Sequence, residues 1–490
     1  MYYWDVVDAY FKDRSIVKQH IDSYNDFVNN RIHNILQEIG DIETNKEGCI
    51  LRLYKLRLEK SVVTEADGSK RPILPLEARL RNLTYYASVF VDMGLIEDGV
   101  EKDRVEVYIG RLPVMVKSDL CHLSGMTRDE LIKAGEDPDD PGGYFIINGS
   151  ERVLISVEDL APNRVIISKE KKSGKDLVIG RIFSTQGGFK AKIAIERNSQ
   201  GQIYISFPAS PKNLNLFIVL KALGLETTED MINALHIRNE EVINDILLNV
   251  EGIEEVTTEE ALQYIGKRVA AGQPEEYRLN RAEYIIENYL LPHIGLEKTD
   301  RIKKAYFLMN MLERIIAVAK GYRDEEDRDH YANKRIKISG NLMEELFRYA
   351  MNYFVKDIKY QVERAYARNR KLQIKTLVRP DALSERIRFS MSTGQWVGRR
   401  QGVSQLLDRM SYMATISHLR RVNSLLSKTH PHFEARDLHP THWGKICPNE
   451  TPEGPSCGLV KNLAMGCTIS ARNIPGLEEE LKQMGVTIKR

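Results

Sequence analysis

The stretch DLHPTHWGKICPNETPEGPSCGLVKN, Asp437–Asn462, decides the interpretation of this 490-residue chain. From His439 to Gly458, seven residues are Pro or Gly. Proline fixes φ and removes a backbone donor, while glycine permits conformations that other residues resist. The sequence therefore predicts a rigid loop that presents Glu450 and Glu453 in defined directions. These carboxylates could position a cation, a cationic side chain or a ribose hydroxyl, or they could cap helices and pair with internal arginines.

Histidines and cysteines in and after this loop raise the question of a zinc site. They are His439, His442, Cys447, Cys457 and Cys467. Structural zinc sites draw on closely spaced cysteine or histidine pairs, whereas nine residues separate successive cysteines here. We therefore expect no bound metal, and we expect His439 and His442 to form hydrogen bonds within the loop. A metal-dependent hydrolase that uses these histidines and nearby carboxylates is an alternative, which stoichiometric zinc in the purified chain would support.

A basic segment precedes the loop. Arg420 and Arg421 are adjacent at the end of a short predicted helix, so they cannot both face one groove of a packed core. At least one must reach solvent or an anion, and guanidinium groups suit phosphate oxygens. The segment predicts a surface for a phosphate backbone, with an ion-paired surface as the alternative. Further basic residues nearby in the sequence are Arg399, Arg400, Arg409 and Lys428.

The formal net charge of +2 conceals a strong segregation of charge. Residues Glu226–Glu260 hold eleven Asp/Glu against one Arg, whereas Tyr331–His430 hold twenty Lys/Arg against seven Asp/Glu. Nucleic acid responds to the local field rather than to the total charge. The basic stretch therefore favours a nucleic-acid partner, although two solvated faces of opposite sign would give the same pattern.

Composition places the chain among water-soluble globular proteins. Hydrophobic residues make up 42% and charged residues 29% of the sequence, which suffices for packed cores. There is no apolar run of about 18 residues, so no membrane helix is expected, and the N-terminus lacks the pattern of a secretory signal. Five cysteines do not form a disulfide framework, and they favour a reducing cytosol. We expect a cytoplasmic protein with no membrane partner.

Hydrophobic periodicity predicts an α+β fold with several packed subdomains. Alternating residues predict a strand around Leu51–Leu58 with a bulge at Lys55, and a hairpin with arms at Lys190–Glu196 and Gln202–Phe207. Helical spacing predicts a long helix over Asn341–Arg368. The remaining helices are predicted at Leu214–Leu223, Glu240–Leu248, Glu259–Ala270, Leu279–Leu290, Asp300–Ala319, Ala382–Phe389, Val403–Met410, Ala414–Leu425 and Leu477–Met484.

The stretch Asp437–Asn462 closely resembles the fork region of the second-largest subunit of multisubunit DNA-directed RNA polymerases. The resemblance continues upstream, in the order of the family and over nearly the whole chain. The other matching blocks are Glu77–Leu83, Leu112–Met115, Tyr144–Glu151, Asp327–Arg335, Gly402–Arg409 and Ser417–Val422. The least family-like part is the acidic stretch Glu226–Glu260.

The resemblance implies a division into four named parts. Residues 1–160 and 335–394 resemble the protrusion, and 161–334 resemble the lobe, which is inserted into it. Residues 395–465 resemble the fork, and 466–490 resemble the start of the external domain. Since the chain ends at Arg490, where a full-length subunit would continue, the resemblance is to the N-terminal part of a split, archaeal-type subunit.

The resemblance also implies which residues lie near nucleic acid. Gln405, Arg420 and Arg421 are expected close to the transcript or template backbone, and Glu450 close to the growing RNA end or the nucleotide. Lys461 and Asn462 complete the set of residues expected near nucleic acid or nucleotide. No complete catalytic site is expected in this chain.

The implied role is positioning during RNA synthesis from ribonucleoside triphosphates, with no cofactor bound by this chain alone. The catalytic Mg²⁺ would be held by the largest subunit. The implied partners are that subunit, the C-terminal half of the second-largest subunit, the DNA template and the RNA transcript. A stand-alone nucleic-acid-binding or regulatory protein derived from a polymerase subunit is the alternative, and an adjacent reading frame for the missing half would argue against it.

Overall fold

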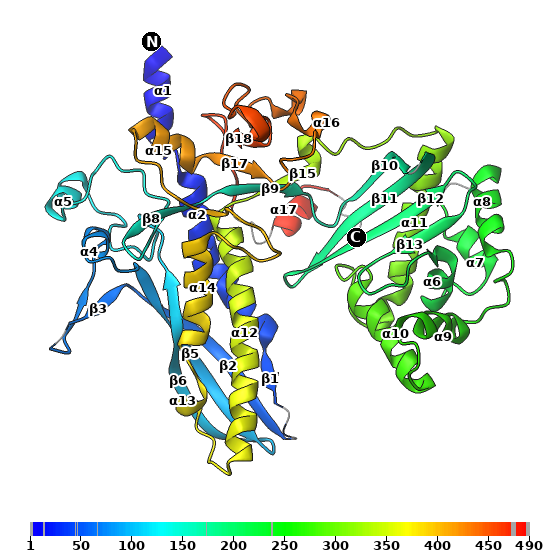
Figure 1. Cartoon of the computed structure of the whole chain (residues 1–490), viewed down its shortest axis with the longest axis horizontal. Helices are drawn as coiled ribbons and strands as arrows, with labels where there is room; N and C mark the ends of the chain where they lie inside the picture. The colour runs from blue at the N-terminus through cyan, green and yellow to red at the C-terminus, as the bar shows by residue number, and fades with distance from the viewer. Residues whose placement is uncertain are drawn as a thin grey trace. The chain divides into compact units, whose positions relative to one another are not determined.

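The structure is a computed structural model, and it describes residues 3–12, 15–44, 46, 48–65, 67–172, 174–236, 239–471 and 477–486. The chain folds into two compact units (Figure 1). The first unit is formed by Met1–Asp159 and Ile336–Arg490, and the second by Leu160–Arg335. The second unit is thus an insertion in the first.

The first unit is organised around an antiparallel sheet of strand order β1-β2-β5-β6. Its strands are β1 (Asp41–Glu43), β2 (Cys49–Glu59), β5 (Tyr86–Glu97) and β6 (Val100–Pro113). The smaller strands are β3 (Val62–Thr64), β4 (Lys70–Pro72), β7 (Phe145–Ile147), β8 (Ser150–Leu154), β9 (Ser156–Leu160), β16 (Ser404–Leu406), β17 (Arg421–Ser424) and β18 (Val460–Asn462).

This unit contains the following helices, several of which pack on the sheet. They are α1 (Tyr3–Lys12), α2 (Lys18–Asp26), η1 (Phe27–Arg31), α3 (Ile32–Ile39), α4 (Pro75–Leu80), α5 (Arg128–Lys133), α12 (Ser339–Ala367), α13 (Ile374–Leu377), α14 (Asp381–Thr393), α15 (Tyr412–Leu419), α16 (Phe433–Arg436), η4 (Pro440–His442), η5 (Gly454–Ser456) and α17 (Leu477–Gln483). In Figure 1, α12 and α14 run side by side along the sheet. One core takes side chains from the sheet and from α2, α3, α12 and α14.

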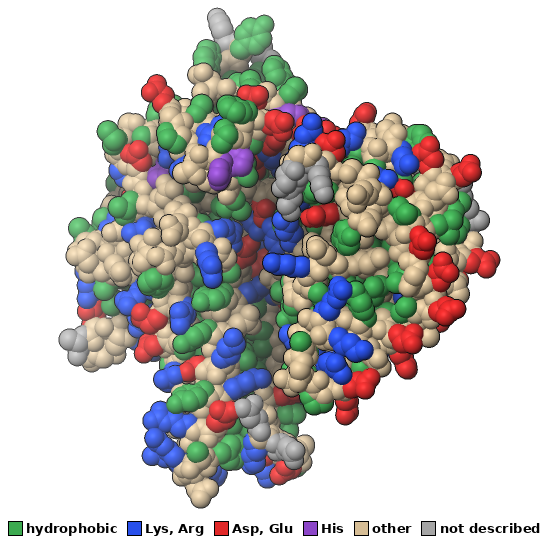
Figure 2. Space-filling view, turned by 45° about the vertical axis from the view of Figure 1, so that its right-hand side comes forward, with side chains coloured by type: hydrophobic (Ala, Val, Ile, Leu, Met, Phe, Trp, Pro, Cys, Tyr) green, Lys and Arg blue, Asp and Glu red, His purple; other side chains and the backbone are tan. Residues whose placement is uncertain are grey.

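The second unit packs helices on a meandering sheet, β10 to β14 in chain order. Its strands are β10 (Val165–Lys172), β11 (Lys175–Gln186), β12 (Phe189–Asn198), β13 (Ile203–Ser206) and β14 (Leu214–Asn215), and β15 (Lys334–Lys337) leads out of the unit. Its helices are α6 (Leu216–Ala222), α7 (Thr228–Asn233), α8 (Glu240–Val250), α9 (Thr258–Val269), α10 (Glu275–Tyr289), η2 (Lys298–Asp300), α11 (Arg301–Lys320) and η3 (Tyr331–Asn333). Figure 2 shows Asp and Glu side chains gathered at the right-hand edge of this unit.

The structure confirms the α+β class and most predicted elements. The bulge lies where expected, as a register shift between Leu53 and Lys55. The hairpin is β12–β13, and the long helix is α12, extended by two residues at its start. Among the described helices, none combines the length and apolar character needed to cross a bilayer.

Two predicted helices are wrong, and both precede the loop Asp437–Asn462 in the sequence. Val403–Met410 is not helical, because Ser404–Leu406 pairs as β16 with β8. Its apolar residues have helical spacing, yet the unpaired edge of β8 supplies backbone partners that spacing cannot reveal. The predicted helix Ala414–Leu425 ends at Leu419, and the chain continues as β17.

Close packing of α12 on α2 depends on a glycine. A Cβ atom placed on Gly340 would lie 1.9 Å from the carbonyl oxygen of Ser23. The Gly340 backbone N–H also donates to Ser23 Oγ at 3.0 Å. The helix start therefore approaches α2 more closely than any other residue would allow.

We expect Gly340→Ala to lower the free energy of unfolding by about 1–3 kcal/mol, because the added methyl must displace backbone. Chemical denaturation followed by circular dichroism measures the change. Asn352→Ala, at an exposed position of the same helix, is the matched control. Equal stability of the two variants would show that α2 and α12 can move apart without cost.

Candidate nucleic-acid interface

Three short strands from distant parts of the chain position the residues of the predicted interface. Strand β17 lies between β9, with which it pairs in parallel, and β18, with which it pairs antiparallel. In this register Arg421 lies opposite Asn462, and Val422 lies opposite both Ser156 and Lys461. The quoted loop therefore ends on a strand that the first unit holds in place.

Arg420 and Arg421 point into different environments, since Arg420 caps α15 and Arg421 begins β17. Arg420 is only 4% exposed. Its guanidinium donates to the carbonyl oxygens of Ile16 and Ala464, the latter at 2.6 Å. Burial lowers the pKa of Arg420. Arg420 therefore braces the segment before α2 against the segment after β18, rather than presenting its charge at the surface.

Arg421 differs from its neighbour in having a guanidinium that is available to a ligand. The residue is partly exposed. Within the described residues, its guanidinium forms no hydrogen bond or ion pair. Since a guanidinium is a fork of five donors with no acceptor, it is suited to phosphate oxygens.

Lys461 and Asn462, which are expected near nucleic acid or nucleotide, are buried. Lys461 Nζ lies 3.0 and 3.2 Å from the carboxylate oxygens of Glu158 on β9. The two side chains are 7% and 4% exposed, so this ion pair is shielded from water. Asn462 is 4% exposed, and its carbonyl accepts from the Cys447 N–H at 2.8 Å. Both residues fasten β18 to the unit.

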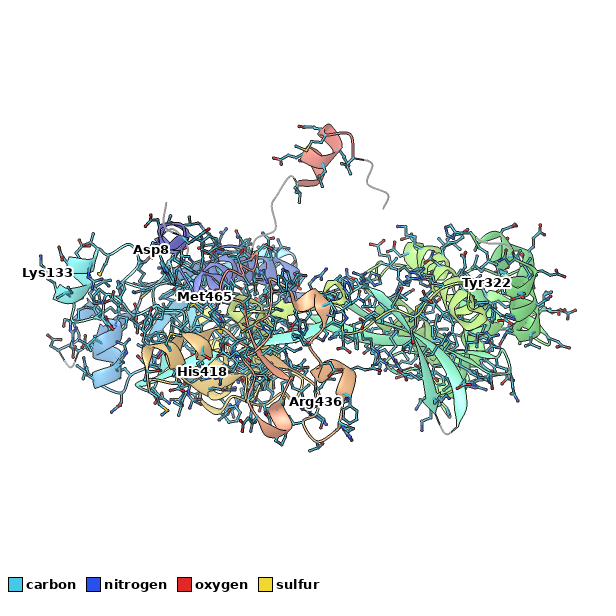
Figure 3. All side chains as sticks on the ribbon, turned by 90° about the horizontal axis from the view of Figure 1, so that it is seen from above. Asp8, Lys133, Tyr322, His418, Arg436 and Met465 are labelled. Carbon is cyan, nitrogen blue, oxygen red and sulfur yellow. The ribbon has the colours of Figure 1, made fainter. Side chains whose placement is uncertain are left out.

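Gln405 is held in one orientation by His418, which Figure 3 labels. His418 Nδ1 accepts from the Asp408 N–H at 3.1 Å, so Nε2 carries the proton and donates to Gln405 Oε1 at 3.0 Å. The Gln405 amide nitrogen donates to the Gly402 carbonyl at 3.0 Å. Burial, together with the charge of Arg421, lowers the pKa of His418 to about 4. The neutral tautomer that this contact requires is therefore favoured near neutral pH.

Glu450 is exposed at the rigid loop, where the Ser417 hydroxyl donates to its carboxylate. Ser417 lies on α15, so the loop is tied to the helix that carries His418 and is capped by Arg420. The positions of Glu450 and Arg421 are thereby linked through a short helix and one strand.

Arg436 holds the loops beside this surface, a role that no sequence motif predicts. Its guanidinium donates to five backbone carbonyls, those of Lys428, His430, Pro431, Pro455 and Cys457, at 2.8–3.3 Å. Gly458 packs against it with φ of +71°, and a Cβ there would lie 2.3 Å from the Arg436 carbonyl oxygen. Long-range contacts of this kind carry no local pattern.

The histidines of the loop do not gather a metal-binding set. His439 Nδ1 lies 2.6 Å from Thr441 Oγ1, and His442 is buried. Over the ranges that the structure describes, no group of three or more His, Cys, Asp or Glu side chains could hold a metal ion. The hydrolase alternative therefore has no ligand set among these residues.

His20 joins this surface to the main core. Its Nε2 donates to the Leu419 carbonyl at 2.7 Å, and its Nδ1 accepts from the Ser339 hydroxyl at the start of α12. Burial lowers the pKa of His20 to about 4. The imidazole is fully buried and neutral, with both nitrogens engaged.

Comparison with known proteins identifies the family to which the chain is similar. Residues 15–385 match the family model described as RNA polymerase beta subunit, and residues 405–469 match RNA polymerase Rpb2, domain 3. DNA-directed RNA polymerase subunit Rpo2N of Methanocaldococcus jannaschii is 51% identical, with 99% of each chain covered. Its counterpart in Halobacterium salinarum is 45% identical over 98% of this chain and 95% of its own. Subunit Rpo2 of Saccharolobus shibatae is 47% identical over 99% of this chain, which spans 43% of that protein.

The Lys461–Glu158 pair leads to a prediction about stability. Lys461→Met should lower the free energy of unfolding by about 3–5 kcal/mol, because it removes the cation that balances the charge of a buried carboxylate. Adding Glu158→Leu should restore most of the loss, since both charges are then absent. Denaturation of the two variants and the parent chain measures this, and a double variant no more stable than Lys461→Met would contradict it.

The environment of His20 predicts how stability depends on pH. The folded pKa of about 4 lies below the ordinary value of 6.5, so between these values the unfolded chain binds the extra proton. Stability is full above pH 6.5 and falls by roughly 3 kcal/mol as pH decreases towards 4. Denaturation between pH 7 and 4.5 should show a shallower slope for His20→Gln than for the parent. The exposed His430→Gln should retain the parent slope.

Proposed function

Because the chain belongs to the RNA polymerase beta-subunit family, we propose that it lines the active-centre cleft of a multisubunit DNA-directed RNA polymerase. In this proposal residues 395–465 position the template and the RNA–DNA hybrid during RNA synthesis. The observation that carries the proposal is the guanidinium of Arg421, which has no hydrogen bond or ion pair to any residue that the structure describes and lies at the start of a strand fixed by buried contacts. Arg421, Gln405 and Glu450 face the nucleic acid or nucleotide.

The buried residues have a different part in this proposal. They are Arg420, Lys461 and Asn462. In this proposal they lie close to the nucleic acid but do not contact it, and they hold the strands β17 and β18 in place. A brace of this kind keeps a phosphate contact in place at low cost in conformational entropy. A misplaced strand would weaken the contacts of Arg421 even with Arg421 itself intact.

The proposal gives the chain no complete catalytic site. The catalytic Mg²⁺ is held by the largest subunit, where metal ions stabilise the attacking and leaving oxygens. The partners are that subunit, the C-terminal half of the second-largest subunit, the DNA template and the RNA transcript, in the cytoplasm. The residues of this chain hold and orient the hybrid while other chains perform the reaction.

The unit boundaries support the proposed division into named parts. The second unit, Leu160–Arg335, corresponds to the lobe. The protrusion is formed by 1–160 and 335–394, the fork by 395–465 and the start of the external domain by 466–490. The basic stretch spans the end of the protrusion and the fork, which agrees with a role beside phosphates.

We expect Arg421→Ala to weaken the hold on nucleic acid in polymerase reconstituted with the other subunits. Loss of one phosphate contact should reduce by about one the slope of log affinity against log salt concentration. The lifetime of a stalled elongation complex at rising salt measures the effect. Arg57→Ala is the control, since Arg57 is exposed and paired with Glu106 on the main sheet.

Two results would count against the proposal. One is an unchanged salt dependence for Arg421→Ala. The other is template-directed synthesis by the purified chain alone, which would require a catalytic site that the proposal places elsewhere.

A further inference from the structure

The long helix α12 carries exposed tyrosines along one face. Tyr349, Tyr353 and Tyr360 are 45%, 41% and 56% exposed. Their spacing of four and seven residues places them on a single helical face. The opposite face is buried in the core of the first unit, for example at Phe347 and Phe354. Single exposed aromatic residues are ordinary, but a row of three on the solvent side of a core helix calls for a reason.

Cationic side chains alternate with these rings. The Arg386 guanidinium of α14 lies 4.0 Å from the centroid of the Tyr353 ring. Arg379 binds Asp357, with its Nε 2.9 Å from Oδ2. Lys356 is exposed between those two tyrosines. We call Tyr349, Tyr353, Lys356, Tyr360, Arg379 and Arg386 the tyrosine stripe.

The stripe is firmly supported. Asp357, which holds Arg379, is only 8% exposed, and α14 packs on both α12 and β6. Because one partner of each guanidinium is fixed by the fold, little conformational entropy is lost when a ligand binds.

The charge around the stripe favours an anionic ligand. From the start of α12 to the end of α14, residues 339–393 include eleven Lys/Arg against six Asp/Glu. Asp357 is already neutralised by Arg379, whereas Lys356 remains exposed. Figure 2 shows Lys and Arg side chains interspersed with green side chains, the colour that includes tyrosine, over the lower part of the first unit.

We propose that the tyrosine stripe binds single-stranded nucleic acid, with bases stacked on the tyrosines and phosphates held by Lys356 and Arg386. Exposed aromatic rings alternating with cations are typical of surfaces that bind single strands, because every base has a face to stack. In a duplex the base faces are already stacked on each other, so a duplex would be bound only through the electrostatic attraction of its phosphates. The tyrosines span ~16 Å along the helix, which suits roughly three nucleotides.

The neighbours of the stripe argue against a protein partner. Protein interfaces bury an apolar centre from which lysine is depleted. Here Lys356 lies in the centre, and the exposed positions beside the rings are polar or charged, namely Asn352, Glu363 and Arg364. The proposal is independent of the function assigned to 395–465, because it uses none of the residues of that segment.

The test is binding of fluorescein-labelled dT20 to the full chain, measured by fluorescence anisotropy at low salt. The double variant Tyr353→Ala/Tyr360→Ala should raise Kd by at least about tenfold, since each stacked base contributes about 1–3 kcal/mol. Tyr353→Phe/Tyr360→Phe should retain the parent Kd, because the rings remain. Tyr277→Ala/Tyr306→Ala is the control, as both tyrosines are exposed on the second unit.

Several outcomes would overturn the proposal. One is a Kd for the alanine double variant equal to that of the control; another is an equal loss of affinity for a 20-base-pair duplex. A third is failure of the alanine variant to assemble with the other polymerase subunits while its Kd for dT20 is unchanged, which would make the stripe a protein contact. Arg421→Ala, measured in the same assay, separates the two surfaces, since its effect should add to that of the stripe variant.

Discussion

The buried ion pair between Lys461 and Glu158 is the interaction on which the arrangement around 395–465 depends. Both charges are removed from water, so neither can leave the contact without a large desolvation cost. A slip of β18 by one residue would turn Lys461 to the other face of the sheet, away from Glu158. We infer that the pair fixes the register of β18 against β17 and β9. The register in turn determines where the loop Asp437–Asn462 joins the sheet, and hence where Glu450 and Arg421 lie.

A second set of buried contacts ties this sheet to the rest of the first unit. His20 forms hydrogen bonds with the end of α15 and the start of α12. Arg420 donates to the carbonyl oxygens of Ile16, before α2, and of Ala464, after β18. The positions near the candidate interface are therefore set by residues hundreds of positions away in the chain. Stability and ligand contact are linked here: a change that loosens His20 or Arg420 should also displace Arg421.

Much of the fold could be predicted from the sequence, because its elements have strong local patterns. The amphipathic helix α12, the bulge near Lys55 and the hairpin β12–β13 follow from periodicity and turn residues. Residues Val403–Met410 could not be predicted, since their structure depends on the edge of β8. The same holds for the site. The segment was found from its proline-rich loop and its basic residues, but the burial of Arg420 and Lys461 depends on distant partners, which composition and spacing do not encode.

The nature of the braces also affects the electrostatic field of the candidate interface. Lys461 is neutralised by a carboxylate, whereas Arg420 and Arg436 donate hydrogen bonds to backbone carbonyls. A carbonyl satisfies a guanidinium donor without cancelling its net charge. These two arginines can therefore hold loops in place and still add to the positive potential that attracts phosphates. Structural and electrostatic roles, which sequence reasoning treats as alternatives for each arginine, are combined in the same side chains.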